Sequence, residues 1–216
     1  MRGQGQVQDP EQAAARLTPR TIAARIAEAE ARMAPAEGET WHQYQIPAGG
    51  RVTHAAVLVP LIHRPGGLNV LLTQRTSHLQ DHAGQISFPG GRVEAEDLNR
   101  DHTALREAEE EIGLPPGQVQ VLGALPEYDM HSGFRITPVV GWVEPPLALK
   151  LDPFEVAEVF EVPLAFILDP ANHQRHFREA PDGKRRYFYA LPYGPYYIWG
   201  ATAAMLVNLA EALNKP

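Results

Sequence analysis

Short runs of apolar residues alternate with turn-forming residues through most of the chain. Two of these runs, AAVLVPLI at 55–62 and LNVLLTQR at 68–75, contain several β-branched residues and are separated by HRPGG. They predict two neighbouring strands joined by a turn. A shorter strand is predicted at GQISF, 84–88, directly before a Pro-Gly-Gly sequence. Further strands are predicted at 119–125, 138–143, 155–162 and 185–191.

Three other segments, at 18–34, 101–112 and 201–213, show the apolar spacing of helices. The first begins at Thr18, a residue type that suits an N-cap, and the second stops at Gly113. The first 16 residues are polar, and we expect no ordered element there. Because strands dominate the middle of the chain and helices flank them, the pattern predicts one α/β domain with a mixed sheet between helices.

Composition narrows the possible partners and chemistry. The 216 residues carry a formal charge of -7, which disfavours binding to nucleic acid or to an anionic membrane surface. No apolar run approaches the roughly 20 residues that span a bilayer, so we expect no membrane anchor and a cytoplasmic protein. The absence of cysteine removes thiolate ligands and thiol nucleophiles. Carboxylate, histidine and hydroxyl chemistry remain.

The predicted helix at 101–112 concentrates negative charge. Glu107, Glu110 and Glu111 fall on one side of it and the apolar residues on the other. Like charges at this spacing repel by about a few tenths of a kcal/mol per pair, so this side is either a solvated acidic face or a site for cations. Carboxylate oxygens are the ligands that hard divalent cations prefer. Arg106, four residues before Glu110, is placed to orient one carboxylate.

The sequence around this helix resembles a known family motif. Gly91, Asp97 and REAEEEIGL at 106–114 resemble the Nudix box, which reads Gly, five residues, Glu, seven residues, then Arg-Glu-apolar-X-Glu-Glu-X-Gly-apolar. The second half matches at every fixed position. The first half departs twice, because Asp97 replaces glutamate and eight residues separate it from Arg106. Asp97 is therefore either a weaker metal ligand or an acid near the N-terminus of the helix.

Residues upstream of the box resemble one branch of this family, the coenzyme A diphosphatases. LLTQR at 71–75, Gly84 and FPGG at 88–91 follow the motif of that branch, which also carries the extra residue inside its box. Thr76 and Gln80 depart from the motif, and Gln80 stands where it has arginine. Two later segments, SGFRITPVVG at 132–141 and EVAEVFEVPL at 155–164, also resemble the branch.

The resemblance implies a Nudix-type α/β/α sandwich over 35–216, preceded by an N-terminal arm and helix at 1–34. It also implies metal-dependent hydrolysis of coenzyme A, or of a related nucleotide, to 4′-phosphopantetheine and adenosine 3′,5′-bisphosphate. The implied cofactor is Mg²⁺ or Mn²⁺. The implied catalytic residues are Arg106, Glu107 and Glu110; the metal ligands are Glu107, Glu110 and Glu111; the substrate-binding residues are Arg75, Gly90 and Gly91.

Several alternatives stay open. The general base is Glu107, Glu110, or a glutamate on a later loop, for which Glu155 and Glu158 are candidates. The substrate is coenzyme A or another nucleotide such as ADP-ribose, NADH or a dinucleotide, and a noncatalytic nucleotide-binding domain is the third possibility. The sequence does not specify the oligomeric state.

The last quarter of the chain contains two other groups of interest. His173 and His176 lie in a polar segment that we expect to be a loop and not a zinc site. The aromatic run at 185–199 is expected mainly in the core, with adenine stacking as the alternative. Arg185 and Arg186 are expected at a solvated strand edge, with contact to a 3′-phosphate as their alternative.

Overall fold

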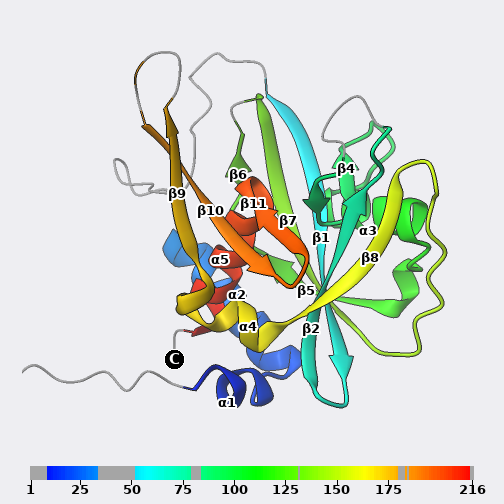
Figure 1. Cartoon of the computed structure of the whole chain (residues 1–216). Coiled ribbons are helices and arrows are strands. Elements are labelled where there is room, and N and C mark those ends of the chain that lie inside the picture. Colours follow the sequence, from blue (N-terminus) through cyan, green and yellow to red (C-terminus); the bar gives the residue numbers. More distant parts are fainter. Residues whose placement is uncertain are drawn as a thin grey trace, which may run out of the picture.

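The strands predicted at 55–62 and 68–75 form an antiparallel hairpin in the middle of a mixed sheet. The computed structural model describes residues 9–33, 52–78, 84–130, 132–179, 183 and 185–214. The hairpin consists of β1 (Thr53–Arg64) and β2 (Gly67–Arg75). Within the described residues the sheet has eight strands, five of which follow the order β3-β2-β1-β7-β5, and β1 runs parallel to β7 (Figure 1).

The remaining strands of this sheet confirm the predicted ones and add two short strands. β5 (Val119–Ala124), β7 (Phe134–Val143) and β8 (Val156–Pro163) correspond to predicted runs, as does β3 (Ile86–Ser87). β4 (Gly90–Arg92) pairs with β1, and β6 (Tyr128–Asp129) pairs with β7. Both additions are too short to produce an apolar alternation that a sequence pattern would reveal.

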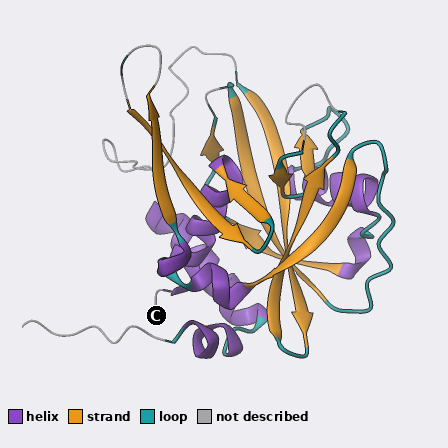
Figure 2. Ribbon diagram, in the orientation of Figure 1, coloured by secondary structure: helices purple, strands orange, loops and turns teal. Residues whose placement is uncertain are grey.

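Helices cover both faces of the sheet, so the predicted α/β sandwich is correct (Figure 2). On one face α3 (Arg100–Ile112) packs against alternate residues of β1 such as Ala56 and Leu58. The other face is covered by α2 (Pro19–Met33), α4 (Leu164–Leu168) and α5 (Gly200–Asn214). Val59 and Leu61 face this second layer, because successive side chains of a strand alternate between faces.

The N-terminal region contains a helix where none was expected. α1 (Pro10–Ala15) begins after Asp9, whose carboxylate accepts a hydrogen bond from the backbone N–H of Glu11. Ala14 and Leu17 are buried in the same core cluster as α2 and α5. The expectation was wrong because this short helix is stabilised by capping and tertiary packing, which the polar composition of the segment does not reveal.

A second sheet of three strands lies beside the first. It consists of β9 (Gln174–Glu179), β10 (Arg185–Tyr193) and β11 (Tyr196–Trp199), in the order β11-β10-β9. The loop expected around His176 is therefore a strand. All six residues of β9 are exposed, so the segment carries none of the apolar alternation by which a half-buried strand is predicted.

The aromatic run at 185–199 divides between the core and the surface. Tyr189 and Tyr196 pack against the core, whereas Tyr187, Tyr197 and Trp199 are exposed. The expectation of a core role is thus correct for only part of the run. Arg185 is exposed, as expected, but it belongs to the middle strand of the second sheet and its guanidinium lies over the ring of Phe177.

Two sequence predictions fall outside the described residues. Gln80, the departure from the upstream motif, is one of them, and the predicted boundary at residue 35 is the other. No helix in the described part of the chain is long and apolar enough to cross a membrane.

Candidate active site

The acidic helix α3 has well-defined ends. The side chain of Asn99 caps it by accepting a hydrogen bond from the backbone N–H of His102 at 2.9 Å. Gly113 ends it in the left-handed conformation, with φ 67°, which glycine adopts without steric cost. Its inner side buries Glu111 together with Ala104, Ala108 and Ile112, and the adjoining side, which carries Glu107, lies against β4.

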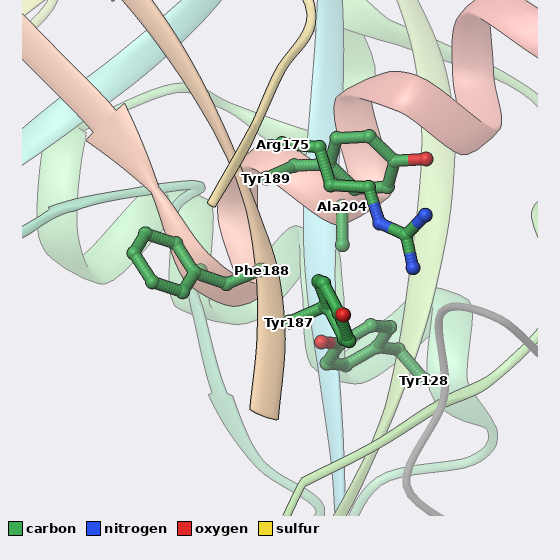
Figure 3. A pocket seen from close by; sticks show the side chains of 7 residues that line it. Tyr128, Arg175, Tyr187, Phe188, Tyr189 and Ala204 are labelled. Carbon is green, nitrogen blue, oxygen red and sulfur yellow. The ribbon is translucent and has the colours of Figure 1, made fainter. Parts of the chain in front are cut away.

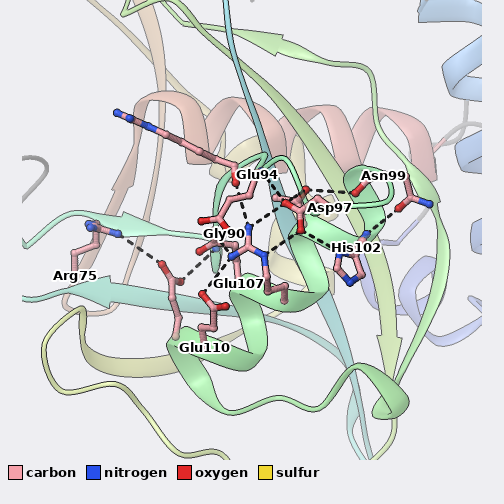
Figure 4. A network of polar contacts seen from close by, with 12 residues as sticks. Arg75, Gly90, Glu94, Asp97, Asn99, His102, Glu107 and Glu110 are labelled. Atoms are coloured by element: carbon pink, nitrogen blue, oxygen red, sulfur yellow. Dashed lines mark hydrogen bonds and ion pairs between the residues drawn. The ribbon is translucent and has the colours of Figure 1, made fainter.

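Asp97 binds the arginine of this helix through its carboxylate. Its carboxylate accepts two hydrogen bonds from Arg106, from Nε at 3.0 Å and from Nη2 at 3.1 Å (Figure 4). It also accepts from the Thr103 hydroxyl at 2.8 Å and from the backbone N–H of Glu94 at 2.9 Å. The Asp97 side chain is 1% exposed, and its bonds to Arg106 hold its pKa far below the usual value.

Arg106, held in this way, contacts two glutamates of its own helix. Its Nη1 donates to Glu107 Oε1 at 2.9 Å and to Glu110 Oε2 at 3.2 Å. Its Nη2 also donates to the carbonyl oxygen of Arg92 on β4. One guanidinium therefore fixes both carboxylates relative to β4, which is the orienting contact that the sequence predicted for Glu110, extended to Glu107.

The two glycines of β4 allow α3 to approach the strand closely. A Cβ atom at Gly91 would lie 2.3 Å from Glu107 Oε1, so no side chain larger than hydrogen fits while Glu107 stays in place. The backbone N–H of Gly90 donates to Glu111 Oε2 at 3.3 Å. Both predicted glycines thus lie against the predicted glutamates.

Glu111 is a buried carboxylate whose negative charge is only weakly compensated by nearby cations. Its side chain is 6% exposed, and the nearest cation is the guanidinium of Arg75, at 3.8 Å. Burial raises the pKa of Glu111 to about 8, despite the opposing effects of Arg75 and the Gly90 N–H. Burial likewise raises the pKa of Glu107, while Arg106 opposes the shift. A solvated acidic face therefore describes Glu110 but not Glu107 or Glu111.

Arg75 connects the upstream motif to this cluster. It lies at the end of β2, between Glu111 and Glu155, with its guanidinium 3.9 Å from Glu155 Oε2. Its Nε is buried and has no hydrogen-bond partner within the described residues. An unpaired buried donor is costly, so this Nε is an unsatisfied polar atom within the site.

The two later glutamates considered as bases lie in different surroundings. Glu155 is close enough to Glu107 and Glu111 to raise the pKa of both. Glu158 is paired across the sheet with Gln74 and contacts the hydroxyl of Tyr196 in the second sheet. Only Glu155 therefore belongs to the acidic cluster.

The donor set fits a hard divalent cation. Glu107, Glu110, Glu111 and Glu155 supply only oxygen atoms, and burial leaves the charge of Glu111 poorly compensated. In the described part of the chain no three acidic or histidine side chains already surround one point. The carboxylates instead contact Arg106 and Arg75, so binding a cation requires them to turn from those partners.

The sequence did not identify the residues that hold the Asp97 carboxylate in place. Thr103 and His102 both contact this carboxylate, His102 through Nδ1 at 3.0 Å. Their position in the first turn of the helix is the one available signal, since residues there lie close to the preceding loop. Nothing in the residue types alone distinguishes them from solvent-exposed positions.

Comparison with known proteins identifies the family. A family model described as NUDIX domain matches residues 52–180. The chain is 43% identical over 164 residues to a protein of Escherichia coli strain K12 named uncharacterized Nudix hydrolase NudL. This match covers 75% of the chain and 84% of the relative, and a NudL protein of Shigella boydii serotype 18 matches to the same extent.

Solved structures give weaker matches. A MutT protein from Methanosarcina mazei is 18% identical, covers 76% of this chain and 98% of its own, and has a TM-score of 0.48. A Caenorhabditis elegans Ap4A hydrolase complex is 20% identical, covers 51% and 80%, and has a TM-score of 0.44. The family model and the NudL relatives show that the chain belongs to the Nudix family.

Proposed function

We propose that this Nudix protein hydrolyses the diphosphate of coenzyme A and its derivatives, with Mg²⁺ or Mn²⁺ as cofactor. The products are 4′-phosphopantetheine and adenosine 3′,5′-bisphosphate. One observation carries the choice of substrate: Arg75, the last residue of the upstream LLTQR motif, lies against Glu111 and Glu155 with a buried, unpaired Nε. The same motif ends in Gly90 and Gly91, which lie against Glu111 and Glu107.

In this proposal Glu107, Glu110 and Glu111 hold the divalent cations. Such cations lower the pKa of bound water and stabilise charge on the oxygens of a diphosphate. Arg106 positions Glu107 and Glu110, and Asp97 in turn positions Arg106. The glycines of β4 allow Glu107 and Glu111 to lie directly against that strand. Arg75, whose guanidinium lies between Glu111 and Glu155, supplies a cation to the diphosphate.

Three carboxylates are candidates for the base that accepts a proton from the attacking water. Arg106 contacts Glu107 and Glu110, and a cation bound by them further lowers their basicity. Glu155 is partly exposed, and its nearest cation is the Arg75 guanidinium at 3.9 Å. We therefore assign the role of general base to Glu155. Arg75 is positioned between Glu155 and the buried Glu111.

Hydrolysis across a substrate panel tests the proposal. Coenzyme A, ADP-ribose, NADH and diadenosine polyphosphates are each incubated with the protein and Mg²⁺. The reactions are repeated in oxygen-18 water, and mass spectrometry of the products shows where the label is incorporated. We expect coenzyme A to have the highest kcat/KM and one labelled oxygen to appear in a product. A higher kcat/KM for another nucleotide would reject the substrate, and no hydrolysis of any of them would reject the enzyme in favour of a binding domain.

A further inference from the structure

A hollow lined by tyrosines lies between β10 and the neighbouring strands of the main sheet. Its wall contains Tyr128 from β6, Arg175 from β9, and Tyr187 and Tyr189 from β10 (Figure 3). Its floor is the first turn of α5, where Gly200 and Ala204 are four residues apart and therefore lie on one side of the helix. Two such small residues leave this space open.

The side chains around the hollow combine aromatic faces with a cation. In the register of β9 with β10, Arg175 is opposite Tyr189, and its guanidinium lies 4.3 Å from the centre of the Tyr187 ring. Figure 3 shows Arg175, Tyr187 and Tyr128 turned into the same space, while Phe188 points to the other side of β10. Aromatic faces stack on nucleic acid bases, and a guanidinium binds phosphate.

The strand register connects this hollow to the glycines of the acidic site. Arg92 is paired with Ala55, Ala55 with Ile136, and Ile136 with Tyr128, so the four residues form one row across β4, β1, β7 and β6. Adjacent strands are about 4.8 Å apart, which places Tyr128 about 14 Å from β4. That separation is comparable to the length of an extended nucleoside diphosphate.

The guanidinium of Arg92 provides a positive charge between the two ends of this row. Gly91 faces Glu107, and side chains alternate along a strand, so Arg92 lies on the same face as Tyr128. Its guanidinium lies 5.2 Å from the centre of the Phe134 ring on β7, having extended across β1. Within the described residues it forms no ion pair with a carboxylate, so its charge is available to a phosphate.

We propose that the hollow of Tyr128, Arg175, Tyr187 and Tyr189 binds the nucleoside end of the substrate, for a nucleotide whose sugar carries an additional phosphate. The base stacks on Tyr187, Arg175 binds the sugar phosphate, and Arg92 contacts the diphosphate as it runs to Gly90 and Gly91. The inference rests on the proposed function, since coenzyme A carries such a 3′-phosphate on its adenosine.

Binding of two adenosine nucleotides tests this assignment without any hydrolysis. Calorimetry measures the Kd of adenosine 3′,5′-bisphosphate and of adenosine 5′-monophosphate for the wild-type protein and for Arg175→Gln. Loss of a charge-assisted contact should weaken binding of the bisphosphate about tenfold. Binding of the monophosphate should weaken by less than about twofold. Tyr187→Leu removes the stacking surface, so it weakens both nucleotides about fivefold or more.

Arg178→Gln is the matched control. Arg178 is on the same strand and also exposed, but it is three positions from Arg175, so it faces the other side of the sheet. It should change neither Kd. Equal effects of the two arginine variants, or an unchanged Kd for the bisphosphate in folded Arg175→Gln, would overturn the assignment.

The binding result separates this inference from the proposed function. If the wild-type protein does not cleave coenzyme A yet prefers the bisphosphate through Arg175, the proposed function fails and the nucleoside site stands. If it cleaves coenzyme A and the Arg175 and Tyr187 variants bind both nucleotides as the wild type does, the enzyme stands and the nucleoside site is rejected.

Discussion

The acidic side of α3 and the aromatic side of β10 differ in how their parts are distributed along the chain. From Gly90 to Glu111 a single strand, loop and helix supply most of the acidic site. The tyrosine-lined hollow instead draws on β6, β9, β10 and α5, whose lining residues extend from Tyr128 to Ala204 and meet only in the folded protein. A site of local residues leaves a sequence motif, whereas a site assembled from separate elements does not.

The largest expected effect comes from neutralising the buried carboxylate of the acidic site. Glu111→Gln keeps the size of the side chain but removes the charge that binds a cation, so kcat/KM should fall about a thousandfold. Steady-state hydrolysis with Mg²⁺ measures this. Glu109→Gln, an exposed position on the same helix, should stay within about twofold of the wild type. Undiminished hydrolysis by the Glu111 variant would show that the acidic side of α3 is not the catalytic one.

The next effect concerns Asp97, which holds Arg106 in place beside the glutamates. Asp97→Asn leaves the buried side of Arg106 without its ionic partner, and breaking such a pair costs about 3–5 kcal/mol. Urea denaturation should show that loss, and kcat should fall because Glu107 and Glu110 lose their fixed position. The exposed neighbour Glu96→Gln should leave stability unchanged. A stability loss without a change in kcat would limit Asp97 to a structural role.

The third test separates the position of the Glu107 carboxylate from the stability of the protein. Gly91→Ala places a methyl group against the flexible end of Glu107, which moves aside, so stability should change by less than about 1 kcal/mol. The displaced carboxylate should lower kcat/KM about tenfold or more. Gly117→Ala, where a Cβ meets no atom within 4 Å, is the control and should leave kcat/KM unaltered. Equal activity of the two variants would show that the close approach of α3 to β4 has no catalytic importance.

The last effect is a pH dependence of the stability of the metal-free protein. The pKa of Glu111 rises from 4.5 to about 8 on folding, so the folded protein binds a proton that the unfolded chain has already lost. Stability in a chelator should therefore fall by up to a few kcal/mol as pH rises from about 5 to about 8. Glu111→Gln should remove this part of the slope in denaturation experiments. An identical slope in wild type and variant would show that folding does not raise the pKa of Glu111.

Local spacing was sufficient for most of the fold and for the acidic site. The strands of the main sheet and the three long helices follow from apolar runs and apolar periodicity, because each buries apolar side chains along most of its length. Glu107 and Glu111 follow from their spacing on α3. β9 could not be predicted, because all its residues are exposed and only pairing with β10 makes it a strand.

By itself, the sequence determined the α/β class, the acidic helix and its resemblance to the Nudix box, since residues close in the chain stay close in a helix. The tertiary structure alone decided that Asp97 holds Arg106, that Glu155 and not Glu158 joins the cluster, and that Glu111 is buried. It also brought Tyr128, Arg175 and Tyr187 together. Burial and contacts between distant elements depend on how the sheets pack, and no local pattern records that packing.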